Sequence, residues 1–541
     1  MTETSDIIIV GGGIAGITVA LELLEAGDKR HITLLDRCRA DEFGGLARWA
    51  FGGMSLCATP QQKRLGIKDS PDLMLKDWRS FAEFEPEDYW PERWAQDYAE
   101  NNRSLVYDWI IRRGLRFIPA VQWVERGLYA PGNSVPRYHV LWGTAKRLTD
   151  TLISHLEQAA ARSSSKLTIQ FETTVKALET TGGSVTGVQA TNSAGDTKSY
   201  CAETVIVTTG GIGGNIPLVK KHWPKNWGAA PGNILNGNHP YNDGALHEAT
   251  SQIGGAVTHL DKMWNYAAGV PHPQPSFDGH GLSLIPTRSS LWCDHLGKRI
   301  GPMPLVTGFD TNFLCQQVAQ QEKPWSWHIL NYRIARRELA ISGADHNPYI
   351  RDRQAIRFII GMLRGDPWLI DTMLSESDDF IAAGSLDELV QKMNGRTDSP
   401  YIKAHTLRDT VETYDSQVKR APKQWNDDQV RRLQHLRQWT GDKIRTCKYQ
   451  PILDNKALPL IAIKTHLISR KSLGGIQTNL HGQVLNTEGT VIPGLFAAGE
   501  ATGFGGGGAS GKRSLEGTFL SGCIHTARRL AETLLEQRTD T

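Results

Sequence analysis

The sequence predicts an α/β fold in which one parallel sheet is assembled from both ends of the chain and a second domain is inserted between them. A continuous apolar run at 7–10 enters a glycine-rich turn, and a similar run at 494–498 enters another near the end of the chain. Between residues 263 and 434 the composition shifts towards Pro, His, Trp and Arg. Because strands buried on both faces are continuous apolar runs, these observations predict a Rossmann-type sheet in two parts with an α+β domain between them.

The predicted boundaries follow these changes of pattern. Residues 1–262 form the first part of the Rossmann-type domain, 263–434 the inserted domain, and 435–541 the second part. Residues 60–145 are rich in tryptophan and charge and contain helical stretches, so they are predicted to be a helical insertion in the first part. A chain of 541 residues is long enough for two or three domains with sizeable cores.

Composition excludes several classes of protein. A formal net charge of +3 gives no reason to expect nucleic acid or an anionic membrane as a partner. The seven cysteines are spread singly without a Cys-x-x-Cys pair, which is typical of a reduced, intracellular protein and excludes a built-in c-type haem. No apolar run is long enough to span a membrane, and the first strand leaves no room for a signal peptide. We therefore expect a cytoplasmic protein.

The first glycine turn has the spacing expected where a dinucleotide pyrophosphate binds. In the pattern G-x-G-x-x-G, Gly11 allows the tight turn, Gly13 lets the phosphates approach the backbone, and Gly16 packs the helix on the strand. From Ile14 and Ala15 onward the apolar residues have helical periodicity. The N-terminus of this helix is therefore expected to offer N–H groups to the phosphates.

The segment after the second predicted strand, His31–Leu35, favours FAD over a nicotinamide cofactor. Asp36 ends that strand at the distance expected for an acid that binds a ribose hydroxyl. A nicotinamide domain would then continue with another βα unit, but here the backbone is bared by four glycines, as needed beside a flat ring: Gly44, Gly45, Gly52 and Gly53. A flexible surface loop is the alternative, although the segment is too apolar for it, with Leu46, Trp49, Phe51 and Met54.

The middle of the chain contains further strands and glycines. The segments 167–173, 175–179, 185–191 and 198–201 alternate with period two and predict an antiparallel meander. A buried strand from Thr204 then enters glycines at 210–214, without the spacing of a nicotinamide motif and with Pro217 interrupting the next helix. Asp243 is expected to cap another helix. In the insertion, Arg137 and His139 either reach a pocket or belong to a structural loop.

The C-terminal glycine segment is predicted to complete the same site. Gly494–Ala498 is a buried strand that ends at Gly499 and Glu500, whose carboxylate can accept hydrogen bonds from a ribityl hydroxyl. The glycines from 503 to 511 are flanked by a buried strand and an apolar helix ending at Leu534, so a flexible linker is the weaker interpretation. The N-terminus of that helix is expected to face the flavin pyrimidine.

These pieces, in this order, resemble the flavoprotein family that contains soluble fumarate reductase and 3-ketosteroid dehydrogenase. Stretches such as 66–70, 133–136, 289–292 and 516–519 resemble a branch known as putative FAD-binding dehydrogenases. The family implies a Rossmann-type FAD domain of the glutathione-reductase kind, a mobile cap, and hydride exchange between flavin N5 and a carbon near a carbonyl or carboxylate. It implies FAD contacts at these residues: Gly11, Gly13, Ile14, Ala15, Gly16, Asp36, Arg37, Gly44, Gly45, Gly52, Gly53, Met54, Val175, Thr209, Gly210, Gly211, Asp243, Gly499, Glu500, Gly517, Thr518 and Phe519.

Departures from the family pattern shape the remaining expectations. Leu46 stands nearest to the histidine that attaches flavin covalently in some members, so FAD is expected to be non-covalent. Lys471 stands where fumarate reductases have a histidine, and their Thr-Glu pair has no clear counterpart near Ile285 to Arg288, which disfavours dicarboxylate reduction. Arg513 nevertheless stands where fumarate reductases have a substrate-binding arginine.

Four residues are candidates for catalysis. Arg513 is a candidate anchor for a carbonyl or carboxylate, with an ordinary surface or phosphate arginine as the alternative. Tyr266 is a candidate acid or base, with a core aromatic as the alternative, and Lys471 and Tyr332 are weaker candidates. The leading hypothesis is desaturation of an apolar, cyclic, ketosteroid-like ketone. The alternatives are a fumarate-type enoate reductase and a flavin-binding protein without turnover. The sequence names no electron acceptor.

Overall fold

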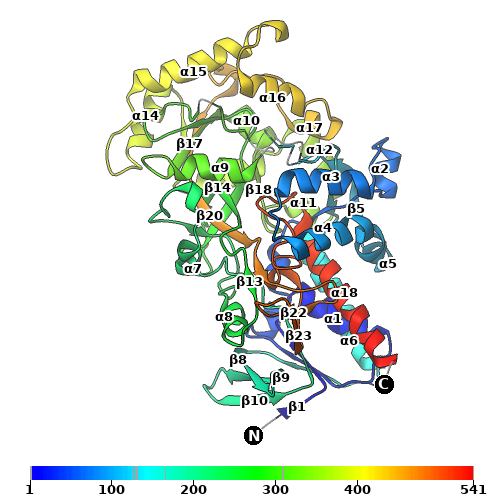
Figure 1. Ribbon diagram of the computed structural model, residues 1–541. Coiled ribbons are helices and arrows are strands. Elements are labelled where there is room, and N and C mark those ends of the chain that lie inside the picture. The colour runs from blue at the N-terminus through cyan, green and yellow to red at the C-terminus, as the bar shows by residue number, and fades with distance from the viewer. Residues whose placement is uncertain are drawn as a thin grey trace. The chain divides into compact units, whose positions relative to one another are not determined.

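The computed structural model describes residues 3–124, 126–127, 132–164, 166–301, 303–306 and 310–539. The contacts divide the chain into two units (Figure 1). Unit 1 comprises Met1–His222, Asn238–Trp264 and Lys471–Thr541, and unit 2 comprises Trp223–Gly237 and Asn265–Arg470. Unit 1 therefore contains both ends of the chain. Unit 2 extends beyond the predicted boundary at 434, because strand β20 (Leu460–Ser472) pairs with strands of that unit.

The central sheet of unit 1 is parallel apart from one edge. Its strand order is β22-β23-β11-β2-β3-β7, with β22 antiparallel to β23. Ile7 and Ile9 of β2 pack into one core with helices α1, α6 and α18, whereas Ile8 and Val10 pack into a second core on the other face. The burial of both faces explains why this strand has no polar alternation.

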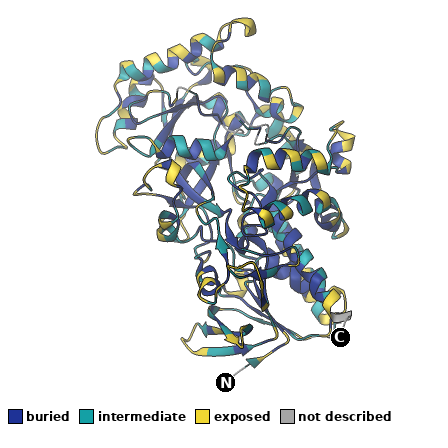
Figure 2. Ribbon diagram, in the orientation of Figure 1, coloured by how far each residue is buried: buried dark blue, intermediate teal, exposed yellow. Residues whose placement is uncertain are grey.

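The strands and helices of unit 1 fall close to the predicted segments. The strands are β1 Glu3–Thr4, β2 Ile7–Val10, β3 Ile32–Leu35, β4 Gly53–Ser55, β5 Phe117–Gln122, β6 Tyr138–Leu141, β7 Leu167–Gln170, β8 Thr173–Thr181, β9 Ser184–Asn192, β10 Thr197–Cys201, β11 Thr204–Val207, β13 Val257–Thr258, β21 Gly475–Ile476, β22 Gln483–Leu485 and β23 Val491–Ala497. The helices are α1 Ile14–Glu25, α2 Pro60–Arg64, α3 Pro71–Ala82, α4 Tyr89–Asn102, α5 Trp109–Arg112, α6 Thr144–Arg162, α7 Ile216–Lys221, α8 Ala245–Gln252 and α18 Thr518–Thr539. Helices α1 and α18 are buried along most of their length (Figure 2).

One predicted strand belongs to a different sheet. β8, β9 and β10 form the predicted antiparallel meander, with β1 added in parallel at its edge. β7 instead pairs in parallel with β3, where Ile32 lies opposite Leu167, so its assignment to the meander is wrong. β7 is a half-buried edge strand. Such a strand alternates like a meander strand, so its pattern gave no sign of the sheet to which it belongs.

Two helix starts also differ from expectation. Pro217 does not interrupt a helix but stands in the first turn of α7, where its missing N–H costs nothing, and the Asn215 side chain caps that helix. For α8 the capping residue is Gly244, at φ +81°, rather than Asp243. The Asp243 carboxylate still accepts a hydrogen bond from the Ala245 amide.

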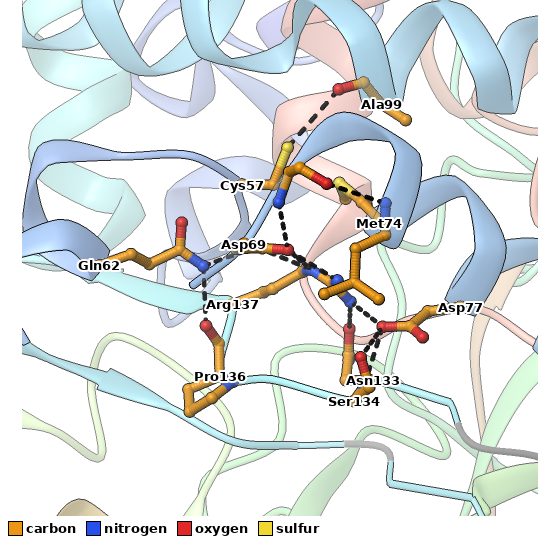
Figure 3. Close-up of polar contacts among 12 residues, drawn as sticks. Cys57, Gln62, Asp69, Met74, Asp77, Ala99, Asn133, Ser134, Pro136 and Arg137 are labelled. Carbon is orange, nitrogen blue, oxygen red and sulfur yellow. Dashed lines mark hydrogen bonds and ion pairs between the residues drawn. The ribbon is translucent and has the colours of Figure 1, made fainter. Parts of the chain in front are cut away.

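The segment predicted as a helical insertion lies in unit 1 and is fastened by a buried ion-pair network (Figure 3). The Arg137 guanidinium donates to Asp69, with an Nη2–Oδ1 distance of 2.8 Å, and to Asp77, with an Nη1–Oδ2 distance of 2.5 Å. Ser134 donates to Asp77 from both its amide and its hydroxyl, and Gln62 donates to Asp69. Burial alone would lower the pKa of Arg137, but the two carboxylates raise it overall. Arg137 is therefore part of a structural network.

Unit 2 is built on a mixed sheet with helices around it. The strand order is β16-β17-β20-β14-β15-β18, and β12 and β19 also pair with β20. The strands are β12 Leu235–Asn236, β14 Met263–Pro271, β15 Gly281–Ile285, β16 Leu291–Cys293, β17 Trp325–Asn331, β18 Ala340–Ile341, β19 Phe380–Ala383 and β20. The helices are α9 Thr311–Ala319, α10 Tyr332–Glu338, α11 Pro348–Arg351, α12 Ala355–Arg364, α13 Pro367–Glu376, α14 Leu386–Asn394, α15 Ala404–Val418, α16 Asp428–Leu436 and α17 Thr440–Arg445. Within the described part of the chain, none of the helices has the length and hydropathy needed to cross a membrane.

Candidate functional site

A cavity opens in unit 1 at the carboxyl ends of the parallel strands. Ligands of open α/β sheets bind at this edge. Of the predicted cofactor-binding residues, fourteen line the cavity: Gly11, Gly13, Ile14, Ala15, Asp36, Arg37, Gly44, Gly45, Val175, Thr209, Gly210, Asp243, Glu500 and Phe519. The structure thus gathers residues from both ends of the chain around one space.

The glycines in and after the turn between β2 and α1 have different roles. A Cβ at Gly11 would lie 2.6 Å from the Thr208 carbonyl oxygen, and one at Gly16 would lie 2.1 Å from the Gly11 oxygen, so both positions serve close packing. A Cβ at Gly13 would meet nothing within 4 Å. Gly13 is also the capping residue of α1, and no side chain caps the amides of the first turn. These amides at the cavity wall suit a pyrophosphate.

The carboxylate of Asp36 is fixed where β3 ends. It accepts hydrogen bonds from the amides of Gly12 and Cys38, the latter at 2.7 Å. Arg37, the next residue, forms an ion pair of 2.9 Å with Asp243 and stacks over the Tyr241 ring at 4.3 Å from its centroid. An acid and an aromatic group at this end of the cavity suit a ribose and its base.

A histidine lies in the same part of the cavity. The ring of His239 stacks on Trp49 with a centroid distance of 5.1 Å. Burial, followed by the charge of Arg37, lowers the pKa of His239 to about 4. The imidazole is therefore neutral at physiological pH and adds no charge beside Arg37.

In the loop after Asp36, the first pair of glycines lines the cavity and the second pair packs against the protein. Gly44 and Gly45 line the cavity, and the Gly44 amide donates to the Gly12 carbonyl. Gly52 and Gly53 lie outside the lining: a Cβ at Gly52 would be 2.7 Å from the Ala145 nitrogen, and one at Gly53 would overlap the Tyr138 ring. Met54 is fully buried in the core. The second glycine pair therefore seats β4 against its neighbours.

The C-terminal segment closes the other end of the cavity. Glu500 is buried and accepts a hydrogen bond of 3.1 Å from the Ser472 amide. Gly211 packs against both of these residues, since a Cβ there would be 2.5 Å from the Ser472 hydroxyl and 2.7 Å from the Glu500 carboxylate. The rings of Phe504 and Phe519 lie 5.0 Å apart at the cavity wall. This end combines a buried carboxylate with an apolar, aromatic surface.

The glycines that follow are packed. Residues 501–511 are buried, and a Cβ at Gly505 would lie 2.6 Å from the Trp94 ring. The segment is therefore not a flexible linker. Three predicted positions nearby lie outside the lining. Gly499 packs on Ala15, Gly517 packs on the Ser55 amide, and Thr518 starts α18 with its side chain buried.

The four candidate catalytic residues lie in different places. Lys471 lines the cavity, with its amino group 5.4 Å from the Phe519 ring centroid. Arg513 lies in unit 1 outside the lining, where its guanidinium pairs with Glu83. Tyr266 and Tyr332 belong to unit 2. Arg470 stacks over the Tyr266 ring at 4.8 Å, and the Tyr332 hydroxyl donates to Asp371 at 2.8 Å.

Several lining residues were not among the predicted contacts. They include Cys38, Thr173, Thr174, Thr208, His239, Tyr241, Asn242, Phe504, Leu520 and Cys523. Thr208 and Tyr241 stand within two residues of predicted contacts, so the ends of the neighbouring strand and turn were usable signals. Nothing local marks Cys523, which reaches the cavity because α18 packs against α1.

Comparisons with known proteins agree with this geometry. A family model described as an FAD binding domain matches residues 6–520. A KsdD-like steroid dehydrogenase of Mycobacterium tuberculosis is 39% identical over 97% of this chain and 94% of its own length. In fold, the chain is similar to 3-ketosteroid Δ1-dehydrogenase from Sterolibacterium denitrificans, with a TM-score of 0.70, 16% identity and coverage of 99% and 100% of the two chains. It is also similar to the open conformation of a flavocytochrome c3 fumarate reductase, with a TM-score of 0.69, 19% identity and coverage of 99% and 78%.

The cavity residues fit the cofactor that this family binds. The uncapped amides of α1, the acid at the end of β3 and the buried acid before α18 line the cavity and have the chemistry to bind the phosphates, the ribose and the ribityl chain of FAD. Because the FAD binding domain model matches most of the chain and the mycobacterial relative is 39% identical over almost all of it, this chain belongs to the family of FAD-dependent oxidoreductases that includes the KsdD-like steroid dehydrogenases.

Proposed function

We propose that this enzyme desaturates a CH–CH bond next to a carbonyl in an apolar, cyclic, ketosteroid-like substrate, with non-covalent FAD as cofactor. The observation that carries the proposal is the 39% identity, over 97% of the chain, to a protein described as a KsdD-like steroid dehydrogenase. Membership of an oxidoreductase family argues against a flavin-binding protein without turnover. An enoate reductase of the fumarate type remains the alternative, since the fold is shared with such an enzyme.

Three positions in the cavity lining support the proposal that FAD is bound non-covalently. Leu46, at the position nearest to the attaching histidine of some members, carries no nucleophile. Cys38 and Cys523 also line the cavity, and burial followed by nearby carboxylates raises the pKa of each thiol to about 12. Neither thiol is therefore a nucleophilic thiolate at neutral pH.

The residues around Lys471 suit the flavin end of the cofactor. Bound FAD supplies a hydride acceptor at N5. We assign to the Lys471 ammonium the stabilisation of negative charge on the pyrimidine side, because it lines the cavity beside aromatic and apolar groups that exclude water. The N-terminus of α18, which starts at Thr518, would act in the same direction.

The substrate-binding roles are also part of the proposal. Arg513 would anchor the substrate carbonyl after exchanging its ion pair with the half-exposed Glu83 carboxylate. Tyr266 would be the acid or base that acts on the α-carbon proton, and Tyr332 is the weaker candidate. We also propose a cytoplasmic location, since all seven cysteines are free, as is usual in a reducing compartment.

Anaerobic mixing of the oxidised holoenzyme with saturated 3-ketosteroids, and of the reduced holoenzyme with enoates, tests the proposal. We expect the ketosteroids to bleach the visible flavin absorbance and fumarate-type enoates to leave the reduced flavin unchanged. If ketones do not bleach the flavin and enoates reoxidise the reduced flavin, the enzyme is an enoate reductase of the fumarate type. A Lys471→Met variant should retain FAD and bleach at least about tenfold more slowly, because removing one electrostatic partner of the developing charge has an effect of this size.

A further inference from the structure

Helix α12 (Ala355–Arg364) presents large apolar side chains to solvent. The exposed fractions are 77% for Ile356, 51% for Ile359, 49% for Ile360 and 61% for Leu363. Their spacing, i, i+3, i+4 and i+7, places them on one face of the helix. No residue of α12 is buried. A contiguous apolar face of this kind on a soluble unit marks an interaction surface.

The helix is held in place by its ends and by its opposite side. Arg336 donates to the carbonyl of Arg364 at 2.7 Å, and Arg337 donates to the carbonyl of Leu363 at 3.1 Å, so two cations cap its C-terminus. At its start the Phe358 amide donates to the Gln354 carbonyl at 2.9 Å. Phe358 and Met362, on the inner side, are half-buried. The apolar face is therefore exposed on an anchored helix and not on a frayed one.

Positive charge flanks the apolar face. Arg357 and Arg364 are spaced i and i+7, so they lie on the same side of the helix, and the exposed Arg353 lies two residues before its start. Across the described residues, Arg353 and Arg357 form no ion pair, and α12 itself contains no acidic residue. Trp368, just beyond the helix, is also exposed, at 36%. Two arginines beside an apolar stripe, with an exposed tryptophan in the helix that follows, are typical of a helix lying in a lipid interface.

We propose that α12 docks this enzyme onto the surface of an anionic lipid bilayer, lying in its plane. A helix of ten residues is too short to span the membrane. The isoleucines and Leu363 would enter the acyl boundary, and the arginines would contact lipid phosphates. A second copy of the chain fits this face less well, because α12 contains no acidic residue that could pair with the arginines of the other copy.

Docking onto a bilayer does not depend on the proposed function, because its test measures binding to vesicles and not turnover of a substrate. Where that function also holds, the surface would bring the enzyme to the phase in which apolar ring compounds dissolve. Failure of the steroid assay would leave the vesicle assay unaffected, and the reverse is equally true.

Flotation of the full-length, FAD-loaded protein with unilamellar vesicles tests the docking. We expect binding to phosphatidylcholine vesicles containing phosphatidylglycerol, at least about tenfold weaker binding to phosphatidylcholine alone, and a severalfold loss at high salt. The double variant Ile359→Glu, Ile360→Glu should reduce binding at least about tenfold, since it removes two of the four apolar anchors and adds two repelled charges. Flavin absorbance and the melting temperature should stay as in the parent.

A matched control uses Leu65→Glu, which changes an apolar residue of unit 1 that is 40% exposed. It should bind vesicles like the parent. Arg357→Gln, Arg364→Gln should lose most of the preference for anionic lipid while retaining the weak binding to neutral vesicles. Equal flotation of the parent and the α12 variant, no flotation of either, or a dimer in sedimentation that the α12 variant abolishes would each overturn the proposal.

Discussion

Two clusters of polar groups in unit 1 differ in how many of their hydrogen-bond and ion-pair partners the chain itself supplies. Around Arg137, two carboxylates, an asparagine, a serine and a glutamine meet the charges, and the side chains of Arg137, Asp69 and Asp77 are 0%, 0% and 3% exposed. In the cavity, α1 begins at Ile14 after the capping residue Gly13, no side chain caps it, and the space in front of that glycine is open. The first cluster is closed by the chain itself, and the second is built to be completed by another molecule.

The difference shows how a structural cluster can be distinguished from a binding site. Both contain buried charge, and buried charge alone identifies neither. A change in the closed cluster should reduce the free energy of unfolding, whereas a change at the open one should weaken cofactor binding and leave the fold intact. Substitutions of Arg137 and Gly13 test this separation, and changes at Gly505 and Asp97 measure the strength of closed packing and closed ion pairing elsewhere in unit 1.

Arg137→Met should have the largest effect. It leaves the carboxylates of Asp69 and Asp77 buried without their cation, which typically costs about 3–5 kcal/mol. Urea unfolding of the variant, followed by circular dichroism, measures the loss. Adding Asp69→Asn and Asp77→Asn should recover part of it, and this triple variant remains informative if the single variant does not fold. A loss below about 1 kcal/mol would mean that the network is not closed as described.

Gly505→Ala is expected to cost about 3 kcal/mol, because it combines an unfavourable φ with overpacking. Gly505 has φ +127°, and a Cβ there would be 2.6 Å from Trp94. The control is Gly489→Ala, which also has positive φ but meets nothing within 4 Å and should cost only about 1 kcal/mol. Thermal unfolding of both proteins with FAD present makes the comparison. Equal losses would show that Trp94 does not pack on the glycine loop.

Gly13→Ala tests the open cluster. The new methyl group would point into empty space, so the apoprotein should unfold like the parent. It would stand where the pyrophosphate approaches the backbone, and we expect FAD to bind about 100-fold more weakly, equivalent to about 2.7 kcal/mol. Titration of apoprotein with FAD, followed by fluorescence, measures the affinity. Gly16→Ala should show the opposite pattern, an unstable apoprotein, because its Cβ would overlap the Gly11 oxygen.

Acid pH should have the smallest effect, through Asp97. Its carboxylate accepts from His525 at 2.7 Å and from Arg529 at 2.7 Å, which joins α4 to α18. Burial alone would raise the pKa of Asp97, but these partners lower it to about 2. Since the folded pKa is below the unfolded one, the carboxylate contributes about 2 kcal/mol above about pH 4. This contribution is lost as the pH falls towards 2.

The comparison with Asp97→Asn isolates that contribution. The difference in unfolding free energy between parent and variant should be constant from neutral pH to about pH 4 and should shrink below it. A difference that does not change with pH would show that Asp97 is not stabilised as an anion.

The sequence was sufficient to predict features that depend on neighbouring residues. The strand Ile7–Val10, the turn at Gly11 and Gly13, and Asp36 all follow from local spacing, and FAD follows from them together with the family resemblance. Contacts between distant residues could not be predicted. Arg137 pairs with Asp69, which lies 68 residues earlier in the chain. The strand Leu167–Gln170 joins the parallel sheet because α6 returns the chain to β3.

The net charge and composition of the chain did not reveal the exposed face of helix α12. The net charge of +3 gave no reason to expect an anionic membrane, yet Arg357 and Arg364 lie on one side of α12 in unit 2. The composition of the inserted domain indicated only that a second domain was present. The exposure of its helix α12 depends on how the surrounding chain packs, which composition does not describe.

The central sheet of unit 1 also has a consequence for how the protein is made. β11 lies between β2, from the start of the chain, and β23, from its end. A ribosome therefore releases the glycine turn between β2 and α1 long before it releases the strand and the Glu500 carboxylate that complete the sheet and cavity. The nascent chain must hold an unfinished sheet edge while all of unit 2 is synthesised, and such edges aggregate readily. The cavity is thus complete only after the residues from Lys471 to Cys523 that line it have been synthesised.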